Sequence, residues 1–223
     1  MEKHRDKITI WILRIVVVAI FTFLIFFAIG IFVIQDKGKP SNHQFSDGDI
    51  IFQTSKSGQS KAIQIATNSK YSHMGILYDK DGKWLVFEAV QPVKLTPLDT
   101  WIRRGKGGHY VVKRLKNADQ LLTPSKLALL KQIGKSYMGK NYDLYFDWSD
   151  DRMYCSELVW KIYHRALKID IGKLQHLKDF DLSSPVVKTK LKERYGNKIP
   201  YDELVISPQA MFNSDLLVQV AEE

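Results

Sequence analysis

The stretch Met153-Tyr154-Cys155-Ser156-Glu157-Leu158-Val159 contains the only cysteine of this 223-residue chain. Two aspartates precede it and apolar residues recur behind it at helical spacing, so the sequence predicts a helix that begins at Cys155. The positive end of a helix dipole favours a thiolate in the first turn. Taken alone, Cys155 fits a small buried hydrophobe slightly better than a nucleophile, because free cysteine is among the most buried residue types.

A long apolar segment near the N-terminus predicts a membrane anchor at residues 8–34. Arg14 is the only charge in this segment, and the 20 residues from Ile15 to Ile34 carry none. About 20 such residues span a bilayer, whereas a signal peptide has a shorter apolar region followed by small residues at a cleavage site. No such site follows, so we expect an uncleaved, single-pass anchor. A buried core helix would not be so uniformly apolar at a chain end.

The charges around this segment predict which side of the membrane the main domain occupies. The excess of basic residues on the N-terminal side favours a short cytoplasmic N-terminus, residues 1–7, and a domain outside the cytoplasm. An exposed, unpaired thiol is a liability in such an oxidising compartment. This placement favours a functional role for Cys155.

Composition limits the classes of function. Removing residues 1–36 leaves 187 residues, enough for one domain with its own core. The formal charge is +9, which favours anionic surfaces such as lipid head groups, acidic wall polymers or nucleic acid. The charges are dispersed and follow no zinc-finger or RNA-module pattern, so we predict no nucleic-acid site.

Motifs for cofactors and metals are missing from the sequence. It contains no HExxH, no CxxC and no phosphate-binding glycine loop. Four histidines of the chain show no metal-ligand spacing: His43, His109, His164 and His176. We therefore expect neither a cofactor nor a metal.

The order of predicted elements indicates an α+β domain at residues 45–223, preceded by a polar linker at residues 35–44. Strand-like patterns come early, at residues 49–53, 72–78, 83–90 and 109–115, and helical patterns dominate later, at 124–135, 155–167 and within 185–195. Shorter helices are expected at 61–68 and 97–103, and an edge strand at 215–220.

Two strand residues, His73 and Glu88, flank a predicted hairpin turn and form a candidate pair. A two-residue loop of Lys80-Asp81 would place them directly opposite each other, and a loop of Asp81-Gly82 would place them on a diagonal. Both arrangements put the two side chains on one face of the sheet. A bulged turn at Gly82 would put them on opposite faces. Taken singly, a partly buried histidine or a carboxylate at a strand end is structural more often than catalytic.

Cys155, His73 and Glu88 together would supply the three groups of a thiol hydrolase. The thiolate attacks a carbonyl, the imidazole protonates the leaving group, and the carboxylate orients the imidazole. The backbone N–H of Cys155 is a candidate oxyanion donor. Tyr154 and Tyr142 are candidate hydroxyl donors in substrate binding, although aromatic packing is the more common role for each.

At these residues the chain resembles the YiiX/YebB-like cysteine hydrolases, which are circularly permuted relatives of the NlpC-type, papain-fold enzymes. In that family the histidine and the acidic residue precede the cysteine, as they do here. The resemblance covers roughly residues 45–217 and rests on several motifs in order: Gly48-Asp49-Ile50-Ile51-Phe52, Ser72-His73-Met74-Gly75, Phe87-Glu88-Ala89, Asn141-Tyr142-Asp143, Tyr154-Cys155-Ser156-Glu157-Leu158 and Ile206-Ser207-Pro208-Gln209.

The resemblance implies a permuted papain-like domain with an antiparallel sheet packed on helices. It implies Cys155 as nucleophile, His73 as base and Glu88 as orienter. The N-terminal anchor is not required by that fold and would be an addition to it. The implied substrates are peptidoglycan stem peptides, other amides or lipids. Acyltransferases similar to lecithin:retinol acyltransferase keep the thiol chemistry but move acyl groups.

We therefore expect a membrane-anchored cysteine hydrolase that cleaves an amide or peptide bond in the cell envelope, with peptidoglycan peptides as the leading substrate class. One alternative is a thiol acyltransferase or lipid amidase at the membrane surface. A second alternative is an inactive binding module on the same scaffold, against which the intact Cys155, His73 and Glu88 argue. The sequence makes no prediction of oligomeric state.

Overall fold

The computed structural model describes residues 45–223. The predicted N-terminal segment 1–7, anchor 8–34 and linker 35–44 lie outside this part of the chain. Within residues 45–223, no helix is both long and apolar enough to cross a membrane.

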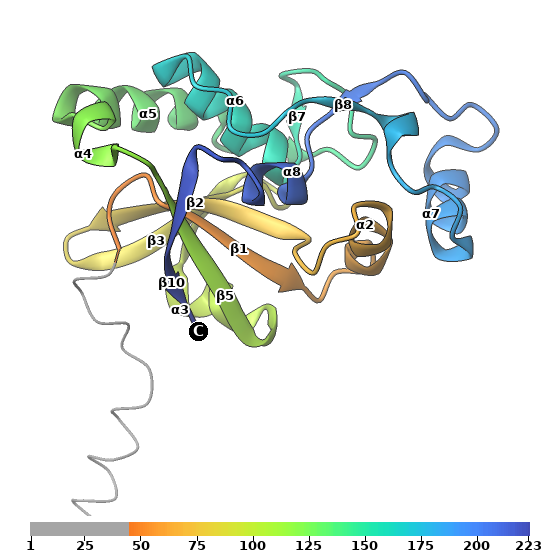
Figure 1. Ribbon diagram of the computed structural model, residues 1–223, viewed down its shortest axis with the longest axis horizontal. Helices are drawn as coiled ribbons and strands as arrows, with labels where there is room; N and C mark the ends of the chain where they lie inside the picture. Colours follow the sequence, from red (N-terminus) through yellow and green to blue (C-terminus); the bar gives the residue numbers. More distant parts are fainter. Residues whose placement is uncertain (1–44) are drawn as a thin grey trace, which may run out of the picture. The chain divides into compact units, whose positions relative to one another are not determined.

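A six-stranded antiparallel sheet forms the centre of the domain (Figure 1), with strand order β10-β5-β1-β2-β3-β4. Its strands are β1 (Ile50–Ser55), β2 (His73–Lys80), β3 (Lys83–Glu88), β4 (Lys94–Pro97), β5 (Gly105–Leu115) and β10 (Leu217–Glu222). The last strand returns to the edge of the sheet, as its sequence predicts. β4 was not predicted, because it is short and ends in a proline, which only an edge strand tolerates well.

Helices cover the sheet and extend beyond one end of it. They are α2 (Ser60–Ala66), α3 (Leu98–Arg103), α4 (Ala118–Leu121), α5 (Pro124–Tyr137), α6 (Cys155–Leu167), α7 (Pro185–Tyr195) and α8 (Pro208–Phe212), with a 3-10 turn, η1 (Leu177–Asp179). Short strand pairs join the loops between them: β6 (Asn141–Tyr142) with β7 (Arg152–Met153), and β8 (Gln175–His176) with β9 (Leu204–Val205). The predicted antiparallel sheet packed on helices is thus confirmed.

Both faces of the sheet are buried, which explains why β1 is apolar at successive positions. Side chains alternate between the faces of a strand. Ile50 and Phe52 belong to the larger core beneath α5 and α6, and Ile51 belongs to a second core that includes Trp101 of α3. Figure 1 shows α5 and α6 on one side of the sheet and α3 on the other.

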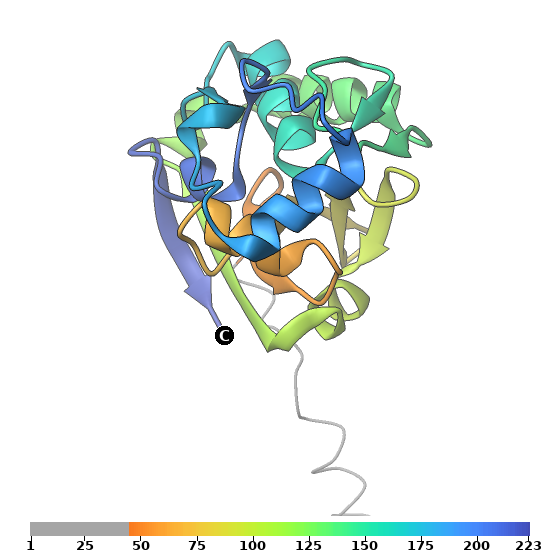
Figure 2. The ribbon, with the colours of Figure 1, turned by 90° about the vertical axis from the view of Figure 1, so that its right-hand side faces the viewer.

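A third, smaller apolar cluster joins α2 to α7, which lie side by side in Figure 2. Its buried members are Ala62 of α2, Leu177 of η1, and Val187 and Leu191 of α7. The two helices come from opposite ends of the domain sequence, so this contact brings early and late segments together beside the end of the sheet where β2 begins.

The β2–β3 hairpin decides between the registers left open by the sequence. Lys80 pairs with Lys83, so the loop is Asp81-Gly82. Both loop residues have positive φ, 55° and 75°, as a two-residue type I′ turn requires. Of the three possible turns, this one places His73 and Glu88 on a diagonal of the same face.

Candidate active site

His73 and Glu88 form a buried pair at the start of β2 and the end of β3. Nε2 of His73 lies 2.6 Å from Oε2 of Glu88, and the Glu88 side chain is fully buried. The other carboxylate oxygen accepts a hydrogen bond from Thr96 Oγ1 at 2.6 Å and pairs with Arg104. Burial acts to raise the pKa of Glu88, but the bonds to His73 and Thr96 and the charge of Arg104 outweigh it and lower the pKa below its usual value. Glu88 is therefore a carboxylate.

The His73 ring interacts with this carboxylate and with Cys155. Because Nε2 faces Glu88, Nδ1 is the ring nitrogen that remains to interact with Cys155. Burial alone would lower the pKa of His73, but its interactions with Cys155 and Glu88 prevail and raise it to about 9. The ring also stacks on Trp101, with centroids 5.9 Å apart. With this raised pKa the His73 ring carries a second proton at neutral pH.

Cys155 is the first residue of α6 and is almost fully buried, with 3 % of its surface exposed. The predicted helix and the observed helix begin at the same residue. As the first helical residue, its N–H has no acceptor within the helix, so it remains a candidate donor to an oxyanion.

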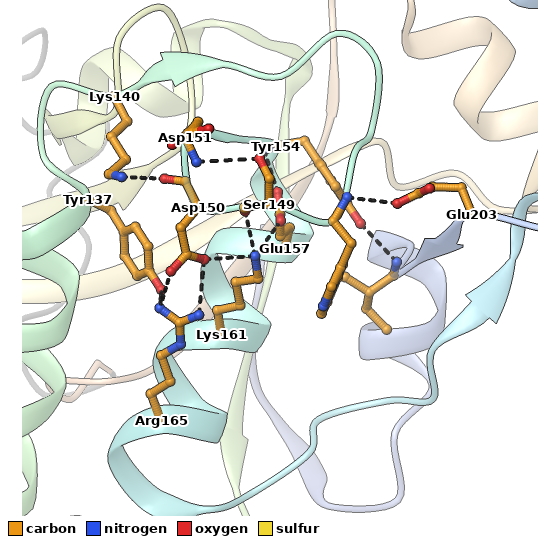
Figure 3. Close-up of polar contacts among 12 residues, drawn as sticks. Tyr137, Lys140, Ser149, Asp150, Asp151, Tyr154, Glu157, Lys161, Arg165 and Glu203 are labelled. Carbon is orange, nitrogen blue, oxygen red and sulfur yellow. Dashed lines mark hydrogen bonds and ion pairs between the residues drawn. The ribbon is translucent and has the colours of Figure 1, made fainter. Parts of the chain in front are cut away.

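A buried network holds the first turns of α6 (Figure 3). Oε2 of Glu157 accepts the Tyr154 N–H at 3.3 Å, and the other oxygen lies 2.8 Å from Lys161 Nζ. Lys161 also donates to the Ser149 carbonyl and to Asp150, which binds Arg165. Burial outweighs Lys161 and raises the pKa of Glu157 to about 8. This network ties the helix carrying Cys155 to the loop that precedes β7.

Tyr154 uses its hydroxyl within the fold. The hydroxyl accepts a hydrogen bond from the Ile206 N–H at 3.1 Å, and the ring packs edge-on against Phe146 with centroids 5.1 Å apart. The side chain is buried. These contacts match the packing role that the sequence left open for Tyr154.

Tyr142 has a different environment, because a chain of donors directs its proton. Arg194 donates to Oε1 of Gln59, and Nε2 of Gln59 donates to the Tyr142 hydroxyl oxygen at 2.8 Å. Arginine is only a donor, so it fixes which end of the Gln59 amide carries oxygen. The Tyr142 oxygen therefore accepts from Gln59 and its own proton is available for another group. Burial and then the charge of Cys155 raise the pKa of Tyr142 well above 10, so the hydroxyl stays protonated.

Two hollows meet at this site. Cys155 lines an apolar pocket between α2, η1 and α7, and His73 lines a polar groove. The residues common to both are Gln59, Tyr142, Lys190 and Arg194. Cys155 and His73 thus lie where an apolar and a polar surface join. A substrate whose scissile bond lies at this junction would have one part in the apolar pocket and the other in the polar groove.

Comparison with known proteins identifies the chain. Residues 44–221 match the model of a family described as permuted papain-like amidase enzymes, YaeF/YiiX, C92 family. The chain belongs to this permuted papain-like amidase family. It is 56% identical over 176 residues to the uncharacterized protein YiiX of Escherichia coli (strain K12), covering 79% of this chain and 86% of that protein. It also resembles the crystal structure of a protein described as metalloprotein yiiX from Escherichia coli O157:H7, with a TM-score of 0.77 and 54% identity over 81% of this chain and 98% of that one.

Membership in the permuted amidase family confirms the predicted fold and the predicted enzyme class: the chain is a cysteine hydrolase of the papain-like type. Among residues 45–223, no three histidine, cysteine, aspartate or glutamate side chains gather as a metal site.

Four residues of the site were missed at the sequence level. Thr96 lies two positions along β4 from Lys94, the partner of Glu88, and that strand was not recognised. Arg104 follows α3. Gln59 is the residue before α2, and Arg194 lies in the last turn of α7. None of the four belongs to a motif, and each reaches the site through tertiary packing.

Proposed function

We propose that the chain hydrolyses amide or peptide bonds with a triad of Cys155, His73 and Glu88. The observation that carries this assignment is the position of His73, which lies 2.6 Å from a buried, ionised carboxylate and interacts with the only cysteine of the chain. Membership in a family of papain-like amidases supports the same chemistry.

In the proposed reaction, the Cys155 thiolate attacks the carbonyl carbon of the amide. The carbonyl oxygen becomes an oxyanion, which the N–H of Cys155 and the Tyr142 hydroxyl would stabilise. His73 gives its proton to the leaving nitrogen as the carbon–nitrogen bond breaks, leaving a thioester. His73 then takes a proton from water, and the resulting hydroxide displaces the thiolate to release a carboxylic acid. Glu88 keeps the ring oriented and stabilises its positive charge throughout.

We further propose that the domain works in the cell envelope, held by the segment at residues 8–34. The length and charge pattern of that segment support an anchor with the domain outside the cytoplasm. Peptides of peptidoglycan would be the leading substrate class in that location.

A second candidate is a lipid amidase or thiol acyltransferase, and one observation favours it. The surface of the pocket that Cys155 lines is almost entirely apolar, with contributions from Ala62, Ile63, Leu177, Leu182, Val187 and Leu191. An acyl chain bound there would place its carbonyl beside the thiol. The two candidates share the thioester and differ in the acyl group and in its acceptor.

Exposing cell-wall and lipid extracts to the wild type and to Cys155→Ala, followed by mass spectrometry, tests both. New amine and acid products that appear only with the wild type would support hydrolysis, and their masses would separate peptides from acyl lipids. Cys155→Ser serves as a folding control. If Cys155 were only a packing residue, its serine variant would lose about 1–3 kcal/mol of stability while the folded fraction kept full activity, and the triad would be rejected.

A further inference from the structure

The groove on the His73 side of the site is strongly cationic. Besides His73, the charged side chains that line it are Lys56, Arg103, Arg104, Lys190, Arg194 and, as the single carboxylate, Glu193. The whole chain has 33 basic and 24 acidic residues, so five cations to one anion is a clear local excess. We call these residues the cationic groove.

Several of these charges are not neutralised by the protein. Among the described residues, Arg194 pairs with no carboxylate: its guanidinium donates to Gln59 and lies 4.7 Å from the centroid of the Phe146 ring. The Lys56 amine donates to a backbone carbonyl, that of Arg103, at 3.2 Å. Arg104 shares Glu88 with His73, so two cations face one carboxylate.

The remaining two cations have surface partners. Arg103 pairs with Asp99, and Lys190 pairs with Glu193. Exposed ion pairs of this kind are weak, so they exchange easily for a ligand. A carboxylate in the groove would thus find arginine donors that suit its planar geometry.

The position of the groove relative to the two catalytic groups indicates which part of a substrate it receives. In the proposed function, on which this step rests, the acyl group stays on Cys155 and the leaving nitrogen takes its proton from His73. Cys155 lines the apolar pocket and His73 lines the cationic groove. The groove therefore lies on the side of the leaving amine.

We infer that the amine released by this enzyme carries a carboxylate, as an amino acid or a peptide does, and that the cationic groove is its binding site. The positive charge would attract such substrates and hold the leaving fragment near His73.

A matched pair of amides tests this inference: N-octanoyl-4-aminobenzoate and N-octanoyl-4-aminobenzamide. They share the acyl group and differ in one charge on the leaving amine. We expect kcat/KM for the benzoate to be roughly tenfold higher at low salt, with the preference shrinking as salt screens the groove. A ratio of one or less, or a ratio unaffected by salt, would overturn the inference.

Variants locate the effect. Lys56→Gln, alone and combined with Arg194→Gln, should lower the benzoate-to-benzamide ratio, and comparing each variant on both substrates cancels any general loss of rate. Lys126→Gln is the matched control, since it removes the same charge from an exposed position on α5 outside the groove. An equal loss of preference in the control would mean that total charge, not the groove, selects the carboxylate.

A binding measurement keeps this test separate from the proposed function. Cys155→Ala is titrated with 4-aminobenzoate and with 4-aminobenzamide, and binding is followed by backbone amide NMR shifts. Tighter binding of the benzoate, with shifts at the groove, supports the binding site even if neither amide is hydrolysed. That outcome would count against the proposed hydrolysis of such amides but not against the binding site. Equal or weaker binding of the benzoate overturns the site even if hydrolysis is observed.

Discussion

Nε2 of His73 lies 2.6 Å from Oε2 of Glu88, across a diagonal of the β2–β3 hairpin. The turn at Asp81-Gly82 fixes this contact, because a shift of one residue in register would turn one of the two side chains to the other face. The interactions of His73 with Cys155 and then with Glu88 raise its pKa to about 9 in spite of its burial.

Stability should fall with rising pH because of His73. Its pKa is raised from 6.5, its ordinary value, to about 9 in the folded protein. A raised pKa stabilises the folded state fully below pH 6.5, and this contribution is lost as the pH rises through 9. Urea unfolding at pH 6.5, 8 and 9.5 measures this loss. Between the lowest and the highest pH, the free energy of unfolding of the wild type should fall by up to about 3 kcal/mol more than that of His73→Gln. Parallel curves for the two proteins would contradict the assignment.

Glu88→Gln should give a folded but slower enzyme. The amide keeps the shape of the side chain but cannot stabilise the imidazolium, so we expect kcat to fall by about 10²–10⁴. When the rate of Cys155 alkylation is measured against pH, the midpoint of the curve should lie at higher pH in this variant. The reason is that a less stable imidazolium stabilises the thiolate less. Thr96→Val removes only a neutral donor to Glu88 and should have a smaller effect. Equal effects of the two variants would argue that packing, not charge, matters here.

Gln59→Glu should impair the reaction through Tyr142. A carboxylate at this position accepts the Tyr142 proton instead of donating to its oxygen, so the hydroxyl is withdrawn from the oxyanion. Loss of such a donor costs about 10²–10³ in kcat, and Tyr142→Phe should cost as much. The double variant should be no slower than either single variant, because both remove one interaction. Additive losses would place Gln59 and Tyr142 in separate roles.

Lys161→Met should be destabilising, by about 1–3 kcal/mol. Lys161 is buried and pairs with the fully buried Glu157 at 2.8 Å, so its loss leaves the Glu157 carboxyl group buried without this partner. The double variant Lys161→Met with Glu157→Leu should recover much of the loss, since no unpartnered carboxyl group remains. Thermal unfolding of the three proteins checks this, and a double variant less stable than Lys161→Met would contradict it.

The predicted anchor can be tested directly. Protein extracted from membranes with detergent, but not with alkaline carbonate, should begin at Met1 on N-terminal sequencing, apart from removal of the initiator methionine. A mature chain that begins near residue 36 would mean a cleaved leader and a secreted enzyme. A variant that lacks residues 1–36 is the matched control: it should be active but should no longer be retained in the membrane fraction.

The sequence alone determined which groups take part in the proposed chemistry. Cys155 begins its helix in the structure as predicted, because the apolar spacing behind it is a local property of the chain. His73 and Glu88 were found in the same way, as polar residues in apolar strands on either side of a turn. The possible turns between the two strands then left three ways of pairing them, and the alternation of side chains decided in which of these His73 and Glu88 share a face.

Only the tertiary structure decided the register, the partners and the surfaces. The two positive φ angles at Asp81 and Gly82 selected the diagonal pairing, and the short edge strand β4 supplied Thr96. The chain from Arg194 through Gln59 to Tyr142 joins α7, the start of α2 and β6, which are far apart in sequence. Local patterns cannot specify such contacts, because they arise from how the whole domain packs. For the same reason, only the folded domain reveals that Cys155 faces an apolar pocket while His73 faces a cationic groove.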